Sequence, residues 1–277
     1  MAKKKRPEPQ PAPKFGPLFD AHTHLASCGA RSADQVQALL DRAADAGVVG
    51  VCTIGDGLEE TELAYAAAHA DPRVWAATAI HPTRAGELDD EAKTRLSEMA
   101  RDPRVVAIGE TGLDWYWIGK KEGVASREQQ IEAMQWHAEL ARAVNKPLMI
   151  HNREADADLL DQLQNFEGTV ILHCFSSPLE VAHEAIDRGY ILSFTGNVTF
   201  KRNDDLRQAV ADAPLENLLV ETDAPYMTPE PYRGTRNEPT YIGWQVRTMA
   251  EARGMEPAEM AQQLVDNACR IYGVQLP

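Results

Sequence analysis

The sequence predicts a TIM (β/α)8 barrel, because strand-like and helix-like segments alternate eight times along its 277 residues. Each strand candidate is a short apolar run, rich in β-branched residues, of the kind that is buried in parallel sheets. Each is followed by a longer segment in which apolar residues recur at helical spacing. The expected strands are residues 18–24, 48–55, 74–81, 105–110, 147–151, 169–174, 190–196 and 217–223.

Helix-capping signals support this alternation. The pattern S-x-x-[E/Q] of a capping box begins three of the expected helices. The pairs are Ser32 with Gln35, Ser126 with Gln129, and Ser177 with Glu180. An open doubly wound sheet is the main competitor, but no GxGxxG motif follows the first strand. The expected helices are residues 33–46, 58–70, 89–101, 127–144, 154–165, 178–188, 203–212, 240–253 and 257–272.

One domain is expected after a short N-terminal arm. A hydrophobic content of 44% is enough for one large core, and α/β barrels often reach this length as one domain. Residues 1–14 are basic and proline-rich and lack the apolar core of a signal peptide, so they are predicted to be a disordered arm. The barrel domain is therefore expected to cover residues 15–277, and the KKKR run is interpreted as a solubilising tail.

Composition excludes several classes of protein. The four cysteines form no CxxC pair, which argues against a disulfide framework and a structural zinc knot and favours a cytoplasmic location. No apolar run approaches the length of a membrane span, so no membrane partner is expected. The net charge of −14 excludes avid nonspecific binding to nucleic-acid backbone. A nucleic-acid substrate remains possible, because divalent cations in a carboxylate-lined site reverse the local charge.

Polar side chains gather at the carboxyl ends of the expected strands. The run VVAIGETGLD carries Glu110 between two glycines at the end of the fourth strand. Active sites of TIM barrels lie at this end of the strands, so the chemistry is expected there. His69, His137 and His183 fall inside helical patterns and are expected to be ordinary, exposed or half-packed helix residues. The histidines at strand ends are His22, His24, His81, His151 and His173.

Two strands carry pairs of polar residues with the same parity. His22 and His24 are separated by one residue, so both should point into the barrel as a chelating pair. Asp20 shares their parity one layer deeper and is expected to orient a ligand histidine. On the last strand, Asp223 lies at the rim with Glu221 below it. Two unpaired carboxylates in a barrel interior would be costly, and cations from metals, histidines or Arg153 would remove that cost.

The whole inventory predicts a binuclear metal site. Four imidazoles and two carboxylates, with His81 in reserve, suit two metal ions that share Glu110 as a bridge. Mixed nitrogen and oxygen ligands without thiolate suit Zn²⁺, Mn²⁺ or Mg²⁺ and do not separate these ions.

Eight short motifs resemble those of one family. The stretches DAHTHL, IHP, IGETGLDWY, IHNRE, HCFSS, SFTGNVTFK, ETDAPY and RGTRNEP occur in the order found in TatD-family metal-dependent hydrolases. The resemblance covers almost everything from Leu18 to the C-terminal helix. It implies an amidohydrolase-like TIM barrel with a binuclear metal site, in agreement with the reading from the residues.

The resemblance also implies a role for each site residue. One metal would be held by His22, His24, Glu110 and Asp223, and the second by Glu110, His151 and His173. Asp223 would also be the base that polarises the attacking water. His81 and Arg153 resemble residues near the scissile group, Asn237 resembles part of the substrate rim, and Tyr226 is a weaker candidate.

The predicted function is hydrolysis of phosphodiester bonds in DNA from an end of a single strand, by a monomer. Two cations and a general base suit in-line attack by water on a phosphodiester. A nucleobase can stack on the aromatic residues of the two long rim segments, 111–126 and 224–239. DNA as substrate, the 3′-to-5′ direction and Mg²⁺ come only from the resemblance.

Three alternatives are open or weaker. Deacylation of D-aminoacyl-tRNA needs the same metal ligands, so the ligands do not separate it from DNA cleavage. A wider amidohydrolase acting on amides, lactones or phosphotriesters often bridges its metals with a carboxylated lysine on the fourth strand, and residues 102–119 contain no lysine. A binding protein on an inactive barrel predicts lost ligands, and none is missing.

Overall fold

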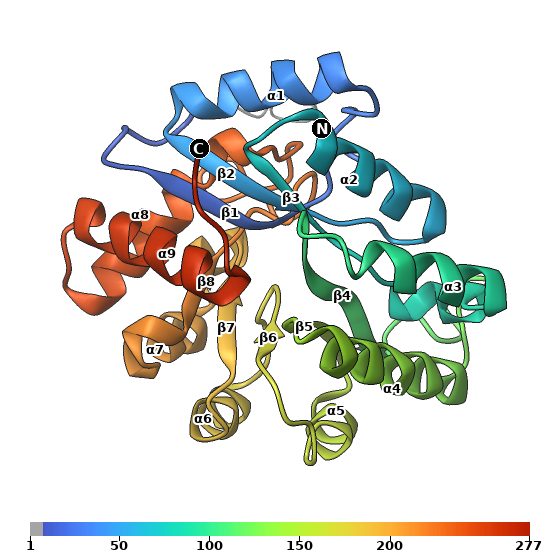
Figure 1. Ribbon diagram of the computed structural model, residues 1–277. Coiled ribbons are helices and arrows are strands. Elements are labelled where there is room, and N and C mark those ends of the chain that lie inside the picture. Colours follow the sequence, from blue (N-terminus) through green and yellow to red (C-terminus); the bar gives the residue numbers. More distant parts are fainter. Residues whose placement is uncertain (1–7) are drawn as a thin grey trace, which may run out of the picture.

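The structure, a computed structural model, describes residues 8–277, and this part of the chain forms the predicted TIM barrel. Eight parallel strands follow one another in the order β1 to β8, and the helices surround them (Figure 1). The strands are β1 (Leu18–Thr23), β2 (Val48–Thr53), β3 (Val74–Ala77), β4 (Val105–Asp114), β5 (Leu148–Arg153), β6 (Val170–Leu172), β7 (Ile191–Phe194) and β8 (Leu218–Val220).

The helices lie close to their predicted positions. They are α1 (Ala33–Asp45), α2 (Leu58–Ala70), α3 (Asp90–Met99), α4 (Arg127–Val144), α5 (Asp156–Gln162), α6 (Leu179–Asp187), α7 (Asp204–Asp212), α8 (Gly243–Arg253) and α9 (Pro257–Tyr272). Short 3₁₀ helices η1 (Pro82–Glu87), η2 (Gly196–Thr199), η3 (Leu215–Asn217) and η4 (Pro239–Tyr241) add to these. Strand β4 is longer than predicted and runs through Asp114, so its loop begins four residues later than expected.

Two of the three predicted capping boxes are confirmed. Ser32 and Ser126 each accept a hydrogen bond from the backbone three residues on, and the glutamine there bonds back to the cap. The third prediction is wrong, because α6 starts at Leu179 with Pro178 as its N-cap. The hydroxyl of Ser177 instead donates to Asp156, 2.5 Å away, and ties the β6–α6 loop to α5.

An apolar layer fills the barrel below the strand ends. It contains side chains from all eight strands, among them Phe19, Trp75 and Met149, and it includes four residues of α9. The hydroxyl of Tyr272 on α9 donates to the backbone carbonyl of Ala21 at 2.8 Å. Helix α9 therefore closes one end of the barrel interior, and the polar residues are left at the other end.

Side-chain and backbone contacts join β1 to β8. Asp20 accepts a hydrogen bond from the backbone N–H of Thr222 at 2.8 Å and also bonds the Thr222 hydroxyl. Burial raises the pKa of Asp20 to about 8. The pairing register of β1 shifts between Asp20 and Thr23, so Asp20 does not share the direction of His22. Asp20 also accepts the backbone N–H of His22 at 3.4 Å, so it holds the backbone of a predicted ligand histidine and does not contact its ring nitrogens, and it joins β1 to the segment after β8.

The predicted arm is only partly described. Its KKKR run lies outside the described residues. Residues 8–14 form no helix or strand, yet Ala12 is buried and the indole of Trp244 donates to the carbonyl of Gln10 at 2.9 Å. Packing against the barrel thus begins before residue 15. No helix in the described range is both long and apolar enough to cross a membrane.

His137 on α4 was expected to be exposed or half-packed, and this expectation is wrong. Its side chain is fully buried between α4, β4 and the segment after β3. Nδ1 donates to the carbonyl of Ala133 at 2.7 Å, and Nε2 accepts the backbone N–H of Ile80 at 3.2 Å. Both bonds are made by one neutral tautomer, and burial lowers the pKa of His137 to about 4.

This burial predicts a specific pH dependence of stability. Between pH 6.5 and about 4 the unfolded chain binds a proton at His137 that the folded chain does not, so the unfolding free energy should fall as pH falls. A shift of this size corresponds to about 3 kcal/mol at the acid end. Urea unfolding of His137→Gln should show a shallower loss over this range than the parent protein. Parallel pH curves would contradict the buried neutral ring.

Candidate metal centre

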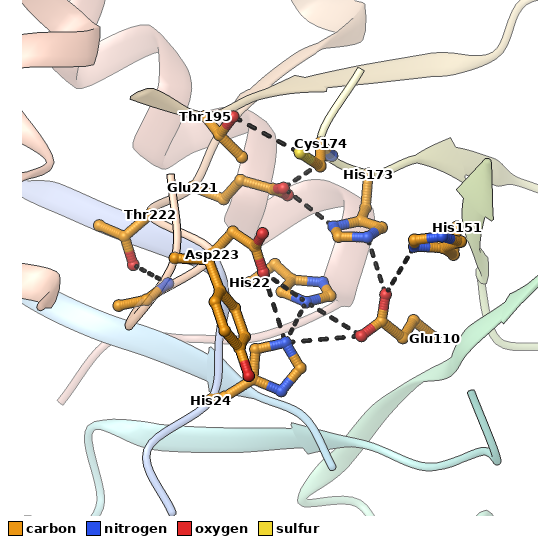
Figure 2. Close-up of polar contacts among 12 residues, drawn as sticks. His22, His24, Glu110, His151, His173, Cys174, Thr195, Glu221, Thr222 and Asp223 are labelled. Atoms are coloured by element: carbon orange, nitrogen blue, oxygen red, sulfur yellow. Dashed lines mark hydrogen bonds and ion pairs between the residues drawn. The ribbon is translucent and has the colours of Figure 1, made fainter. Parts of the chain in front are cut away.

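The carboxylate of Glu110 lies between two pairs of histidines (Figure 2). Its Oε1 is 3.5 Å from Nε2 of His24 and 3.8 Å from Nε2 of His22. Its Oε2 is 2.8 Å from Nε2 of His173 and 3.4 Å from Nδ1 of His151. Each oxygen of one carboxylate thus faces its own pair of ring nitrogens.

Asp223 completes the first side of this arrangement. Its Oδ1 lies 3.4 Å from Nε2 of His24 and 3.7 Å from Nε2 of His22. The residue follows β8 with a φ of 51°, a left-handed conformation that is uncommon for a residue with a side chain. Its backbone N–H donates to the carbonyl of His22 at 2.9 Å, which holds this strained residue against the end of β1.

The charges at the centre are tightly coupled. Burial disfavours the charged form of Glu110, but attraction to the imidazoles, above all His173, outweighs it and holds the pKa of Glu110 well below its usual range. Burial also opposes a charge on His24, yet Asp223, Glu110 and Asp56 outweigh it and raise the pKa of His24 to about 9. The site therefore surrounds the buried carboxylate of Glu110 with imidazoles and further carboxylates.

The donor atoms fit a cation. Nε2 of His22 and Nε2 of His24 face each other at 3.2 Å. Nε2 of His173 is buried and has no assigned hydrogen-bond partner among the described residues, and it forms an ion-pair contact of 2.8 Å with Glu110. A divalent ion would satisfy these nitrogens and neutralise the buried carboxylates. Three compact groups of possible ligands are His22–His173–Asp223, His22–His24–Glu110 and His81–Glu110–His151.

Three of the central histidines are backed by a carboxylate at the other ring nitrogen. Such contacts fix the tautomer and the direction of a metal-binding ring. The pairs are His24 Nδ1 with Asp56 at 3.5 Å, His151 Nε2 with Asp114 at 3.1 Å, and His173 Nδ1 with Glu221 at 3.0 Å. His22 differs, because its Nδ1 faces the sulfur of Met149 at 3.2 Å.

Asp56 and Asp114 were not among the predicted site residues. A signal for Asp114 was present, since it follows Glu110 by four residues in the same run and therefore shares its side of the strand. Asp56 lies three residues after the end of β2, at the same end of the barrel as the histidines. Glu221 was predicted to lie below Asp223, and its contact with His173 was not foreseen.

Gly112 leaves the space that brings His151 beside Glu110. Gly112 on β4 and His151 on β5 are register partners. A Cβ atom on Gly112 would lie 2.1 Å from the carbonyl oxygen of His151, and the residue has a φ of 134°. Both facts require glycine at this position.

His81 lies beside the central group, and Arg153 lies two residues beyond His151 at the end of β5. His81 is half-buried, its ring centroid is 4.5 Å from that of His151, and its Nδ1 accepts the backbone N–H of Thr83 at 3.1 Å. Burial lowers the pKa of His81 to about 3, so the ring is neutral. Arg153 is exposed, and its guanidinium lies 3.8 Å from the ring centroid of Tyr116.

Asn237 does not present its side chain to the rim as the resemblance implied. It is buried, and its Nδ2 donates to the carbonyls of Thr222 at 2.9 Å and Tyr226 at 2.7 Å. Its Oδ1 accepts the backbone N–H of Glu238 at 3.0 Å. Asn237 therefore holds the loop that carries Asp223.

The comparisons with known proteins identify the family of this chain. The family model described as TatD related DNase matches residues 19–273. The chain belongs to this TatD family of metal-dependent hydrolases. The predicted family and enzyme class are therefore confirmed.

Relatives span almost the whole chain. An uncharacterized metal-dependent hydrolase TatD of Mycobacterium tuberculosis is 50% identical, over 93% of this chain and 98% of its own length. A 3′-5′ ssDNA/RNA exonuclease TatD of Erwinia billingiae is 33% identical, over 92% of this chain and 98% of its own length. The crystal structure of YJJV, a TatD homologue of Escherichia coli K12, has a TM-score of 0.83 at 27% identity and covers 93% of this chain and 98% of its own.

Proposed function

We propose that this TatD-family hydrolase is a nuclease that removes nucleotides from an end of single-stranded DNA, using two divalent metal ions. The observation that carries the proposal is the position of Glu110, with one oxygen toward His22 and His24 and the other toward His151 and His173. A carboxylate between two ligand pairs is the arrangement that a bridged pair of ions requires.

Each ion would have its own ligands from this chain. His22, His24, Asp223 and Oε1 of Glu110 would hold one ion, and His151, His173 and Oε2 of Glu110 would hold the other. When bound, two such ions stabilise the attacking and leaving oxygens of a phosphodiester displacement. The mixed nitrogen and oxygen donors suit Zn²⁺, Mn²⁺ or Mg²⁺.

Asp223 is proposed as the general base. Its side chain is 13% exposed, so it lies at the boundary between the buried ligands and the open rim. From this position it accepts the proton of the attacking water. The αL backbone and the contact of its N–H with His22 fix its direction, which matters because proton transfer needs a short, aligned contact.

His81 and Arg153 are proposed to contact the phosphate. The Nδ1 of His81 accepts a hydrogen bond from Thr83, so the neutral ring carries its proton on Nε2 and donates from there. Arg153 supplies a permanent positive charge, and the faces of Tyr116 and Trp117, with centroids 3.8 and 5.3 Å away, keep its guanidinium in one place.

Tyr226 supports a single strand as substrate. It is the large hydrophobic residue that the described chain exposes, at 52%, and its ring centroid is 6.0 Å from that of His24. An exposed ring beside the reactive centre offers a face on which an unpaired base can stack. The relatives named as 3′-5′ ssDNA/RNA exonucleases, at 32–33% identity, point to the same substrate class.

The aromatic residues of the other rim loop have partners already. The indole N–H of Trp115 donates to Asp158 at 2.8 Å, and Arg127 lies 4.7 Å from its ring centroid. Tyr116 lies between Arg153 and Lys120, whose Nζ is 3.6 Å from the ring centroid. These rings pack against the charged side chains of arginine and lysine residues, and stacking of a nucleobase is assigned to Tyr226.

The metal assignment predicts a difference between two variants. Glu110→Ala should lose both ions, because it removes the ligand that they share, whereas His22→Ala should lose mainly one. Elemental analysis of dialysed protein measures the number of Zn²⁺ or Mn²⁺ ions per chain. Two ions retained in Glu110→Ala would contradict the bridge.

The reaction is tested with end-labelled single-stranded DNA in Mg²⁺ or Mn²⁺. The parent protein should shorten the strand from its 3′ end, and Glu110→Ala should not. Asp223→Asn, which keeps the shape but not the basicity, should lower turnover by about 10²–10⁴. Single-stranded RNA, duplex DNA, a D-aminoacyl-tRNA and simple esters provide the comparison substrates. Equal shortening by Glu110→Ala, or none by the parent protein, would leave the deacylase reaction ahead.

Base stacking predicts a graded effect at Tyr226. Tyr226→Ala should raise KM for single-stranded DNA about tenfold, since one stacked base contributes roughly 1–3 kcal/mol. Tyr226→Phe keeps the ring and should retain the parent KM. Because the ring is not proposed to take part in the chemistry, kcat should change little in either variant. An unchanged KM in Tyr226→Ala would remove the stacking role.

A further inference from the structure

Asp114 occupies a position between the metal centre and the rim. It is the last residue of β4, and it is buried, with 1% of its surface exposed. On the neighbouring strand β5, His151 is the partner of Gly112 and Arg153 is the partner of Asp114. Asp114 and Glu110 therefore flank His151 from the two sides along one strand, and His151 contacts both of them.

The two oxygens of Asp114 have different partners. Oδ2 accepts a hydrogen bond from Nε2 of His151 at 3.1 Å, which leaves Nδ1 of that ring to face Glu110. Oδ1 accepts the backbone N–H of Trp117 at 3.0 Å. One carboxylate thus holds a proposed metal ligand with one oxygen and the start of the β4–α4 loop with the other.

The backbone of Asp114 is itself held in place. Its N–H donates to Oε1 of Gln130 on α4 at 2.8 Å, and Nε2 of Gln130 donates back to its carbonyl at 3.2 Å. Gln130 is fully buried and also donates to the carbonyl of Ala125 at 3.1 Å. Both ends of the loop, residues 115–126, are therefore fixed to the same glutamine.

The loop held by Asp114 carries the aromatic support of Arg153. Tyr116 and Trp117 lie under the guanidinium, and the N–H of Trp115 donates to the carbonyl of Arg153 at 2.9 Å. A chain of contacts therefore runs from His151 through Asp114 to Trp117 and on to the guanidinium of Arg153.

We propose that Asp114 is a positioning residue that couples the ring of His151 to the Tyr116–Trp117 support of Arg153. Metal bound at His151 and phosphate bound at Arg153 then strengthen each other, because a coupling between two sites is reciprocal. The phosphate half of this inference rests on the proposed nuclease function. The coupling between the His151 ring and the β4–α4 loop does not rest on that function, and binding of Mn²⁺ alone tests it.

The first measurement is the Mn²⁺ affinity of metal-stripped protein, by calorimetric titration. In Asp114→Asn the amide oxygen can still accept from Trp117, but its NH₂ group faces Nε2 of His151 and favours the tautomer with a proton on Nδ1. The affinity at the weakened site should fall about 10–100-fold, as for other residues that orient a metal ligand. Glu122→Gln, an exposed loss of charge in the same loop, is the matched control and should leave it unchanged.

A double-mutant cycle separates coupling from simple structural support. Tyr116→Ala touches no proposed metal ligand, yet coupling through Asp114 should weaken Mn²⁺ binding about fivefold or more. In the Asp114→Asn background the same substitution should have no further effect. Independent, additive losses in the two backgrounds, or an unchanged affinity in Tyr116→Ala, would overturn the proposal. Melting temperatures of all variants without metal establish that each one is folded.

The substrate arm uses single-stranded DNA at saturating Mn²⁺. Asp114→Asn should raise KM about tenfold or more even when its metal sites are full, because the support of Arg153 is loosened. A normal KM under these conditions would overturn the link to Arg153. If the parent protein does not cleave DNA, the nuclease proposal fails, while the Mn²⁺ cycle still decides whether Asp114 couples the ring to the loop.

Discussion

The interaction on which the rest of the site depends is the burial of the Glu110 carboxylate. A charge at the centre of a barrel is costly unless positive partners surround it. His173 and the neighbouring imidazoles supply that environment, and they hold the pKa of Glu110 well below its usual range. The histidines in turn come from β1, β5 and the end of β6, so the requirement of one carboxylate determines what stands at the ends of three strands.

The need for partners of opposite charge also applies to the imidazoles around Glu110. Imidazoles that face an anion on one nitrogen need a partner on the other, and Asp56, Asp114 and Glu221 provide it for three of them. Negative and positive groups therefore alternate from the centre of the site to its edge. The apolar layer below includes Met149, whose sulfur faces Nδ1 of His22 at 3.2 Å. This order directs the free ring nitrogens toward Glu110.

The fold and the convergence of the site could be predicted from the sequence, because alternating apolar runs and polar strand ends are local patterns. The buried state of His137 could not, since the helical pattern around it does not reveal that Ile80 and Ala133 supply its partners. The direction of Asp20 was missed because a register shift in β1 interrupts the alternation on which parity depends. Ser177 matched a capping pattern, but its hydroxyl donates a hydrogen bond to Asp156 on another helix. Asn237 was misplaced for a similar reason, since its partners belong to a loop that the sequence does not position.

The proposed metal ligands suit several reactions, so the proposed choice of substrate depends on the two rim loops. Each loop is tied to an aspartate of the site by a backbone N–H three residues later, in one case through the side chain and in the other through the backbone carbonyl. The N–H of Trp117 donates to the side chain of Asp114, and the N–H of Tyr226 donates to the carbonyl of Asp223. A turn of this length leaves little freedom between the anchoring residue and the ring. The support of Arg153 and the ring of Tyr226 are therefore each positioned by an aspartate of the site, Asp114 in one loop and Asp223 in the other.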